Sequence, residues 1–335
     1  MKLITFRLTD GVPRLGAWLE DGVRAVDLAR AALARDGDAT PVLTSMQALM
    51  DAGEAGLDLA RKTSDWAANT GDEDLVVPAN NGFSLMSPVP VPAQIRDGLF
   101  FEDHLKQAFA VLRRTRARAE PDPEEALRRF EKAGLFGIPE VWYKRPIYYK
   151  ANRFSVIGSD TDIIWPYYAE NLDYELEFGC FIGKRVRDVS RKDAASHIFG
   201  YSIFNDISAR DVQSEEMPGQ LGPTKSKDFD TGNIIGPCVV TADEIGDPYN
   251  LTMIARVNGE EWSRGNSGSA YWRFEDAIEI MSRSETLYPG EFIGSGTVGG
   301  GCGLEMERSL SPGDVIELEV EGIGILRNRI VRLDS

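Results

Sequence analysis

The sequence predicts an α+β protein in which a small β-rich N-terminal domain precedes a larger domain dominated by strands. The chain has 335 residues, more than one compact core usually takes, so two domains of unequal size are expected. Residues 86–92 (MSPVPVP) repeat proline and force an extended path, which places the boundary at residue 88. From residue 141 onward, short apolar runs alternate with turn residues, as in a strand-rich domain. We therefore expect one domain over residues 1–88 and a second over residues 89–335.

Local patterns predict the individual elements. Residues 1 to about 30 consist of short apolar runs broken by Asp10-Gly11, which predicts a β-meander. Two helical stretches follow, at residues 44–52 and 57–69. A helical insert at about residues 104–135 is predicted from helical patterns at residues 100–118 and 124–133, which PDP at 121–123 separates. Further helices are predicted near residues 191–198 and 274–283.

A strand that carries two glutamates is the most informative motif. The segment DYELEF, residues 173–178, places Glu175 and Glu177 on one face of a strand because successive side chains alternate between faces. Two partly buried carboxylates are costly unless they are protonated or neutralised by a cation. A hard divalent metal is the simplest neutraliser, since Mg²⁺ and Ca²⁺ take oxygen ligands. The alternative is a solvated strand face beside the core.

Three later segments add polar residues to this picture. In GYSIFNDISARDVQ, residues 200–213, an apolar run predicts a strand that breaks at Asn205-Asp206. Asp206 is therefore expected at a strand end, where it is either a ligand or a turn residue. The segments KDFDT at residues 227–231 and PGEFIGSGT at residues 289–297 follow.

Composition narrows the class of protein. The chain has 37 basic and 53 acidic residues and a net charge of −16, which argues against a nucleic-acid partner. Cys180, Cys238 and Cys302 lack zinc-ligand spacing, so free thiols in a reducing compartment are expected. The first residues lack the apolar core of a signal peptide, and no stretch is long and apolar enough to span a bilayer. A cytoplasmic protein without a membrane partner is therefore predicted.

Together, the four segments resemble the fumarylacetoacetate hydrolase family. The D-x-E-x-E strand, the N-D-x-S-A-R-D-x-Q segment, the K-x-F-D-T lysine and the P-G-x-x-I-x-x-G-T loop occur in the family's order and at its usual spacing, and the resemblance covers roughly residues 89–332. It implies a catalytic domain built as a mixed β-roll, and a homodimer. The insert is longer than in small relatives and is expected to cover the pocket mouth.

The resemblance also implies a set of metal ligands. Glu175, Glu177 and Asp206 match the family's three common ligands, and Asp103 falls where longer members supply a fourth carboxylate. Such a site suits Mg²⁺, with Ca²⁺ or Mn²⁺ as alternatives. The absence of histidine and cysteine from the set argues against zinc. The alternative for Asp103 is a helix-start residue.

Further residues match the family's catalytic and substrate-binding positions. Lys227 is expected to stabilise an oxyanion, while Gln213 and Thr297 are expected to bind substrate. His104 is the expected general base, with Glu305 as its partner. The pattern departs at Gln107, where small relatives carry a glutamate. A surface ion pair, a solvent-facing amide and a turn hydroxyl are the structural alternatives for the lysine, the glutamine and the threonine.

The expected function is a divalent-metal-dependent hydrolase that cleaves a carbon–carbon bond in a β-diketone or acylpyruvate-type 2-keto acid. The resemblance implies that the metal chelates two substrate oxygens and stabilises an enolate, in the breakdown of aromatic compounds or sugar acids. A lyase, either a 2-oxoacid decarboxylase or a keto-deoxy-sugar-acid dehydratase, is the alternative on the same platform. A non-catalytic binding protein with this fold is a third possibility.

Overall fold

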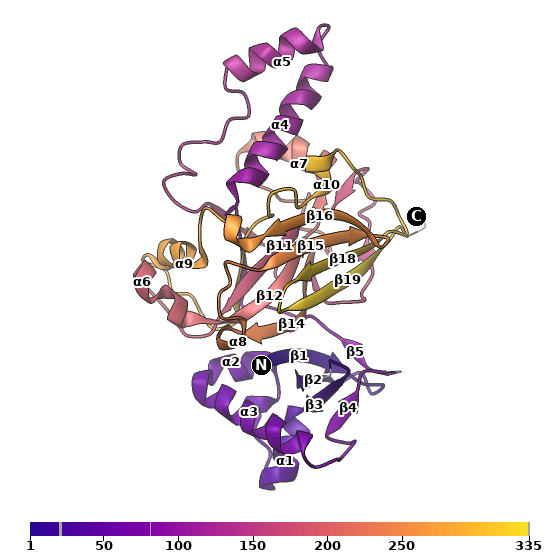
Figure 1. Ribbon diagram of the computed structural model, residues 1–335, viewed down its shortest axis with the longest axis vertical. Helices are drawn as coiled ribbons and strands as arrows, with labels where there is room; N and C mark the ends of the chain where they lie inside the picture. Colours follow the sequence, from indigo (N-terminus) through magenta and orange to yellow (C-terminus); the bar gives the residue numbers. More distant parts are fainter. Residues whose placement is uncertain (20–21, 81, 334–335) are drawn as a thin grey trace.

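The computed structural model describes residues 1–19, 22–80 and 82–333, and Figure 1 shows two lobes stacked along the long axis of the molecule. Within these residues the strands form a twelve-stranded sheet, a five-stranded sheet and a two-stranded ladder. The helices gather at the ends and edges of the sheets, as in an α+β protein, and do not alternate regularly with the strands. The predicted fold class is confirmed.

The N-terminal lobe is built on an antiparallel meander. β1, β2 and β3 pair in sequence order, which confirms the predicted meander. The predicted helices at residues 44–52 and 57–69 correspond to α2 and α3. The sequence did not predict α1, which begins where the Asp27 side chain accepts a hydrogen bond from the Arg30 backbone N–H. The elements of this lobe are β1 Lys2–Arg7, β2 Pro13–Trp18, β3 Arg24–Asp27, α1 Leu28–Asp36, α2 Met46–Asp51, α3 Gly53–Ala68, β4 Val76–Pro78 and β5 Ser84–Leu85.

The two lobes share one sheet. β1 pairs antiparallel with β14 (Asn233–Thr241), so the large sheet has the order β4-β3-β2-β1-β14-β12-β11-β17-β6-β7. Leu3 and Leu15 of the first lobe lie in the same buried cluster as Phe204 and Val239 of the second. A domain boundary at residue 88 stays a prediction, and the sheet runs continuously across it.

The second lobe packs the five-stranded sheet against the large one. Phe178 and Ile203 of the large sheet share a buried cluster with Met253 and Leu318 of the smaller sheet. Every residue of β11 and β12 is buried, whereas β18 buries only alternate residues. The remaining strands are β6 Gln94–Gly98, β7 Tyr148–Ala151, β8 Val156–Ile157, β9 Ile163–Ile164, β10 Leu172–Asp173, β11 Leu176–Ile182, β12 Ile198–Asp206, β13 Ser208–Ala209, β15 Thr252–Val257, β16 Glu260–Asn266, β17 Glu291–Gly294, β18 Val315–Val320 and β19 Gly324–Val331.

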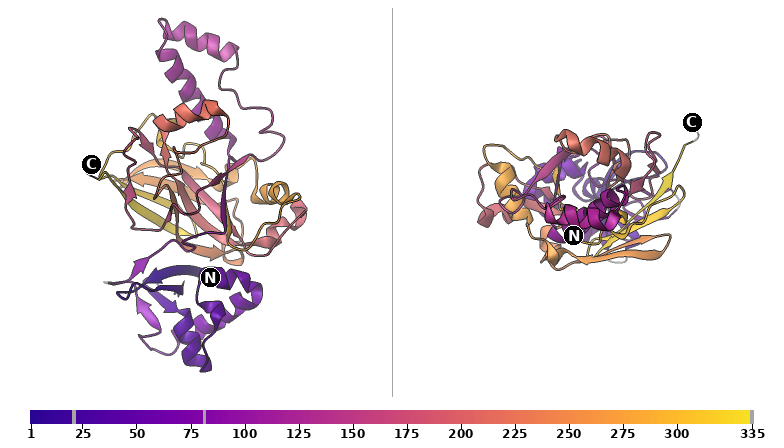
Figure 2. Two further views of the ribbon diagram at one scale, coloured as in Figure 1. Left: turned by 180° about the vertical axis from the view of Figure 1, so that it is seen from behind. Right: turned by 90° about the horizontal axis from the view of Figure 1, so that it is seen from above.

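Two helices form a hairpin that projects from the second lobe (Figures 1 and 2). The predicted helices at residues 100–118 and 124–133 correspond to α4 (Glu102–Arg118) and α5 (Pro123–Lys132). The first half of α4 buries His104, Leu105, Ala108 and Val111 against the body of the lobe. α5 packs on α4 and points away from the sheets. Contrary to the expectation from the sequence, it does not cover a pocket mouth.

Shorter helices complete the second lobe. α9 matches the helix predicted near residues 274–283, and α6 matches the first half of the one predicted near residues 191–198. None of the helices in the described part of the chain has both the length and the apolar character needed to cross a membrane. These helices are α6 Arg191–Ala194, α7 Arg210–Glu216, α8 Ala242–Ile245, α9 Phe274–Ser282 and α10 Gly303–Met306.

Candidate active site

Three buried carboxylates from interior strands of the large sheet converge. Asp97 is the second-last residue of β6, Glu177 lies in β11, and Asp206 is the last residue of β12. The register brings them together, because β6 runs parallel to β17 with Asp97 level with Gly294, and β17 pairs with β11. A side chain at Gly294 would overlap with the Asp97 carboxylate, so glycine leaves the room that this aspartate needs.

These carboxylates have the geometry of a cation site. One oxygen from each of Asp97, Glu177 and Asp206 lies within 4.8 Å of the others, and the residues are at most 4% exposed. Asp97 Oδ1, Glu177 Oε2 and Asp206 Oδ1 are buried and have no hydrogen-bond donor among the described residues. Buried acceptors without a donor are costly. An all-oxygen set of this kind fits a divalent cation such as Mg²⁺, Ca²⁺ or Mn²⁺.

The electrostatics of the triad agree with this interpretation. Burial, followed by repulsion from Asp206, raises the pKa of Asp97 well above its usual range. Burial and the charge of Asp97 raise the pKa of Glu177 in the same way, and burial also raises the pKa of Asp206 despite the nearby Lys227. Three buried carboxyl groups this close together cannot all ionise without a large free-energy cost unless a positive charge lies among them.

Glu175 lies next to the triad and pairs with two cationic side chains. Its Oε2 is 2.8 Å from Lys227 Nζ, and its Oε1 is 2.8 Å from Arg210 Nη1. Burial would raise the pKa of Glu175, but the charges of Lys227 and Arg210 outweigh burial and lower it to about 2. Lys227 Nζ also contacts the carboxylate of Asp206, so this ammonium bridges two of the predicted ligands.

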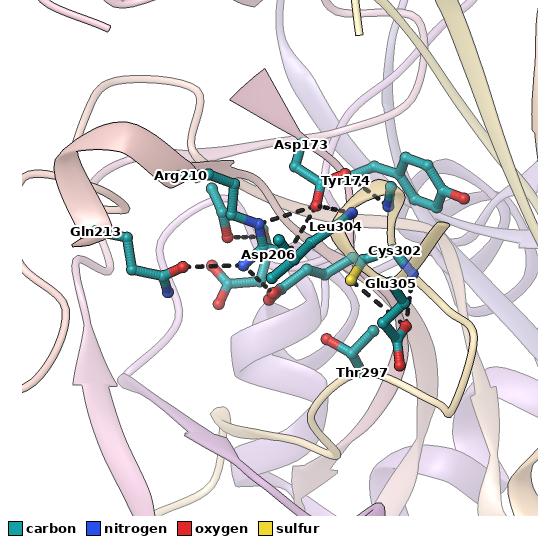
Figure 3. A network of polar contacts seen from close by, with 12 residues as sticks. Asp173, Tyr174, Asp206, Arg210, Gln213, Thr297, Cys302, Leu304 and Glu305 are labelled. Carbon is teal, nitrogen blue, oxygen red and sulfur yellow. Dashed lines mark hydrogen bonds and ion pairs between the residues drawn. The ribbon is translucent and has the colours of Figure 1, made fainter. Parts of the chain in front are cut away.

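Arg210 organises a second layer of polar contacts around Glu175 (Figure 3). Its Nε donates to Asp173 Oδ2 at 2.9 Å, and its Nη1 donates to Gln213 Oε1 at 3.0 Å. Asp173 in turn accepts backbone N–H groups of Gly303 and Leu304, at 2.8 and 3.0 Å, from the start of α10. The arginine therefore links the predicted substrate residue Gln213 to the carboxylates.

The predicted base and its partner lie together. His104 Nδ1 is 3.3 Å from Glu305 Oε1, and the Glu305 side chain has no exposed surface. Glu305 is held at the start of α10 by the backbone N–H groups of Gly300 and Cys302, each at 3.1 Å. His104 is close enough to Glu175 for its charge to lower the pKa of that carboxyl. The pair thus borders the carboxylate cluster, which consists of Asp97, Glu177 and Asp206 with the neighbouring Glu175.

The structure brings most of the predicted site residues together. Thr297 Oγ1 donates to Glu177 Oε1 at 3.2 Å, so its hydroxyl is a partner of the carboxylate cluster. Tyr149, which the sequence did not single out, donates its hydroxyl to Asp206 Oδ2 at 2.6 Å, and burial raises the pKa of this phenol. The predicted residues that gather in this region are Glu175, Glu177, Asp206, Lys227, Gln213, Thr297, His104 and Glu305.

Asp103 does not join them. Its side chain is 62% exposed and lies 3.8 Å from the solvent-facing Lys106 Nζ. The reason is helix geometry: His104, Ala108 and Val111 form the buried face of α4, and the residue before His104 points to solvent. The fourth carboxylate of the cluster is Asp97. The available signal was a charged Arg96-Asp97 pair inside the apolar run IRDGLFF, residues 95–101.

Comparison with known proteins places this site in a family. A family model described as "Fumarylacetoacetate (FAA) hydrolase C-terminal" matches residues 123–331, more than half of the chain. The chain belongs to the fumarylacetoacetate hydrolase family. Asp97 and His104 precede the matched segment, so the structure, not the family match, places them in the site.

Individual relatives in the fumarylacetoacetate hydrolase family differ in their named activities. The chain is 35% identical over 191 residues to the human mitochondrial oxaloacetate tautomerase FAHD2A, a match that covers 56% of this chain and 60% of the human protein. It spans less than two thirds of that relative's length. A fumarylacetoacetate hydrolase from Exiguobacterium antarcticum is 25% identical, with a TM-score of 0.71 over 99% of this chain and 100% of that one. A Sphingobium maleylpyruvate hydrolase in complex with manganese(II) ion and pyruvate shares the fold at 22% identity, with a TM-score of 0.69 and full coverage of both chains.

The raised pKa values predict how cation binding depends on pH. The carboxyls of Asp97, Glu177 and Asp206 hold protons more tightly in the folded state than in the unfolded chain. The metal-free protein is therefore expected to lose stability as pH rises above about 4, the ordinary pKa of a carboxyl, because these protons must leave while the fold is kept. The lowered pKa of Glu175 has the opposite effect on stability. Its carboxylate stabilises the folded state above the ordinary pKa of a glutamate, and this contribution is lost only as pH falls toward about 2.

A divalent cation replaces those protons, so its stabilising effect is expected to grow over the same range. The measurement is the rise in melting temperature on adding Mg²⁺ or Mn²⁺ at several pH values. A rise that is independent of pH, or largest at pH 5, would contradict the assignment of the cation to the buried carboxylates.

Proposed function

We propose that this protein is a divalent-metal-dependent hydrolase that cleaves a carbon–carbon bond in a β-diketone or acylpyruvate-type 2-keto acid. The observation that carries the proposal is the buried set of carboxylates, three of whose oxygens have no donor among the described residues, beside a lysine and a histidine–glutamate pair. These groups supply what such a reaction needs, namely a Lewis acid site, an oxyanion donor and a base.

Asp97, Glu177 and Asp206 would hold the cation, and Glu175 would join them. Their ligand atoms are all oxygens, which favours Mg²⁺, with Mn²⁺ or Ca²⁺ as alternatives. When bound, the cation would supply Lewis-acid polarisation of two neighbouring substrate oxygens. The position of Lys227 supports a cation site here, because its ammonium contacts both Glu175 and Asp206 and shows that these carboxylates favour a positive charge.

His104 would act as the general base. The Glu305 carboxylate at 3.3 Å favours a proton on Nδ1, which leaves Nε2 free to accept a proton. In hydrolysis Nε2 takes a proton from water, and the oxygen of that water adds to the substrate carbonyl carbon. The carbon–carbon bond then breaks, and its electron pair forms an enolate. The same histidine returns the proton to the enolate carbon, which restores the neutral imidazole.

Lys227, Gln213 and Thr297 would orient the substrate and stabilise the charge that develops. Lys227 carries the ammonium that faces the site and would donate a hydrogen bond to the enolate oxygen. Arg210 donates to the carbonyl oxygen of Gln213, so the amide N–H₂ of Gln213 would bind a carboxylate or leaving group. Thr297 lies at the carboxylate cluster and would contact the substrate from the loop after β17.

Lys227→Met is expected to lower kcat about a hundredfold while KM changes less than about threefold, as when one oxyanion donor is removed. Lys225→Met is the matched control, because Lys225 is two residues away, is exposed and donates to the backbone carbonyl of Asp228. Steady-state kinetics of both variants test the role. A rise in KM with an unchanged kcat would restrict Lys227 to substrate binding.

Keto–enol tautomerisation of oxaloacetate is a second candidate. It is favoured by the 35% identity to a human protein named as an oxaloacetate tautomerase. The same groups serve it, because a base that removes a proton beside the carbonyl and returns it to another atom is sufficient. Decarboxylation of a 2-oxoacid uses the same enolate and is the third outcome to be tested.

A metal-replete screen of acylpyruvates, maleylpyruvate-like acids and oxaloacetate separates these reactions by their products. Hydrolysis yields two acids, tautomerisation changes only the enol absorbance of oxaloacetate, and decarboxylation releases CO₂. His104→Gln serves as the negative control for each substrate. Formation of two acids that requires both metal and His104 supports the hydrolase, whereas enol conversion alone favours the tautomerase.

Assembly and compartment are also proposals. A homodimer is expected from the family, and its test is the molecular mass in solution. The cytoplasm is expected from the sequence, although the human relative is named as a mitochondrial protein. The proposed partner is a small keto acid only.

A further inference from the structure

A second group of metal-ligating side chains lies beside the carboxylate cluster. It combines the imidazole of His104 on α4 with the thiol of Cys302 and the carboxylate of Glu305 at the start of α10. One ligand atom from each lies within 4.8 Å of the other two. The sequence analysis paired His104 with Glu305 but did not include Cys302, which lies 198 residues after His104.

Two observations point to a ligand in this group. His104 is 7% exposed, and its buried Nδ1 lies at ion-pair distance from Glu305 but makes no hydrogen bond among the described residues. The ion-pair distance from Nδ1 to Glu305 Oε1 is 3.3 Å, and Cys302 Sγ lies 3.4 Å from Glu305 Oε2. Figure 3 shows the Cys302 sulfur directed at the Glu305 carboxylate.

The separations are of the size found between ligands that share one zinc ion. With Zn–N and Zn–O near 2.0 Å and Zn–S near 2.3 Å, tetrahedral angles place N and O about 3.3 Å apart and S and O about 3.5 Å apart. The observed distances are of this size, 3.3 Å from Nδ1 to Oε1 and 3.4 Å from Sγ to Oε2, and the histidine and the cysteine each face a different oxygen of the Glu305 carboxylate. Three protein ligands of N, S and O type leave the fourth position for water.

We propose that His104, Cys302 and Glu305 form a separate binding site for a thiophilic divalent cation such as Zn²⁺. Its chemistry differs from that of the neighbouring cluster, whose ligands are all carboxylate oxygens. Mg²⁺ and Ca²⁺ bind thiolate and imidazole poorly, so the two sites select different metals. On binding, the Zn–S bond replaces the S–H bond of Cys302, and the thiol proton passes to solvent.

Occupancy of this site would inhibit the enzyme, a consequence that rests on the proposed function. Zinc on Nδ1 of His104 holds the remaining ring proton on Nε2, so the imidazole has no free lone pair to accept a proton from water. The carboxylate cluster keeps its own cation. The site would therefore make turnover sensitive to thiophilic metals without displacing the catalytic metal.

The test uses Co²⁺ as a spectroscopic probe on the Mg²⁺-loaded protein. We expect a thiolate-to-cobalt charge-transfer band that saturates with one equivalent, that Cys302→Ser abolishes, and that the control Cys238→Ser retains. Cys238 is also a buried free thiol, but its Sγ contacts the carbonyl of Ile323. This readout does not depend on turnover, so it remains valid if the proposed reaction is wrong.

Inhibition by Zn²⁺ provides the second arm. The concentration that halves activity is expected to rise at least about tenfold in Cys302→Ser, because one of three protein ligands is lost. If Cys302→Ser does not fold, Cys302→Ala replaces it. The proposal is overturned if wild-type protein gives no charge-transfer band, if the band persists without Cys302, or if Zn²⁺ inhibits the variant equally. In the last case zinc acts at the carboxylates.

Discussion

Asp97→Asn is expected to weaken divalent-cation binding about a hundredfold or more and to abolish measurable turnover, whereas Asp103→Asn leaves both near the wild-type values. Asp97 is buried, one of its oxygens has no donor in the described part of the chain, and its carboxylate lies close enough to those of Glu177 and Asp206 to share a cation. Asp103 is 62% exposed on the outer face of α4. The two substitutions change the same chemical group on either side of one short segment, so they form a matched pair.

The Asp97 variant also gives a readout that separates lost binding from lost folding. Removing a buried carboxyl that repels its neighbours is expected to raise the melting temperature of the metal-free protein. The increase in melting temperature on adding Mg²⁺ should disappear in the same variant. Calorimetric titration with Mn²⁺ gives the affinities directly. If Asp97→Asn binds the cation with wild-type affinity, or if Asp103→Asn loses affinity, Asp103 and not Asp97 is the fourth ligand.

His104→Gln is expected to lower kcat between about 10² and 10⁴-fold while divalent-cation affinity stays within about threefold of wild type. The imidazole is paired with Glu305 and is adjacent to the carboxylates, but it is not among the oxygen ligands. The chain's other histidine, His197, directly precedes β12, at the opposite end of that strand from Asp206, so His197→Gln is the matched control. Glu305→Gln is expected to give a smaller loss, since it keeps the base and weakens its orientation.

The pH dependence of turnover tests the same role. Wild-type kcat/KM should fall on the acid side as the general base becomes protonated, and this limb should be absent in His104→Gln. A rate close to that of wild type in His104→Gln, or an unchanged acid limb, would assign the base to another residue.

Much of the site was predictable from the sequence because its local geometry is periodic. Alternation along a strand was enough to place Glu175 and Glu177 on one face, and both lie in the cluster region. Asp206 was predicted at a strand end and does end β12. The His104–Glu305 pair was expected from family resemblance, and the two side chains do meet across about 200 residues of chain.

The parts that could not be predicted depend on contacts between distant strands. Asp97 becomes a member of the cluster only because β6 lies parallel to β17, which is nearly 200 residues later in the chain. Asp103 was an attractive choice because it precedes the predicted base, yet helix periodicity turns it to solvent. The pairing of β1 with β14, which joins the two lobes, likewise has no local signal in residues 1–30.

The most direct test is the position of Mn²⁺ in crystals of the protein, located by anomalous scattering. We expect one strong peak within about 2.6 Å of carboxylate oxygens of Asp97, Glu177 and Asp206. A peak at the surface near Asp103, or density only at His104, Cys302 and Glu305, would contradict it.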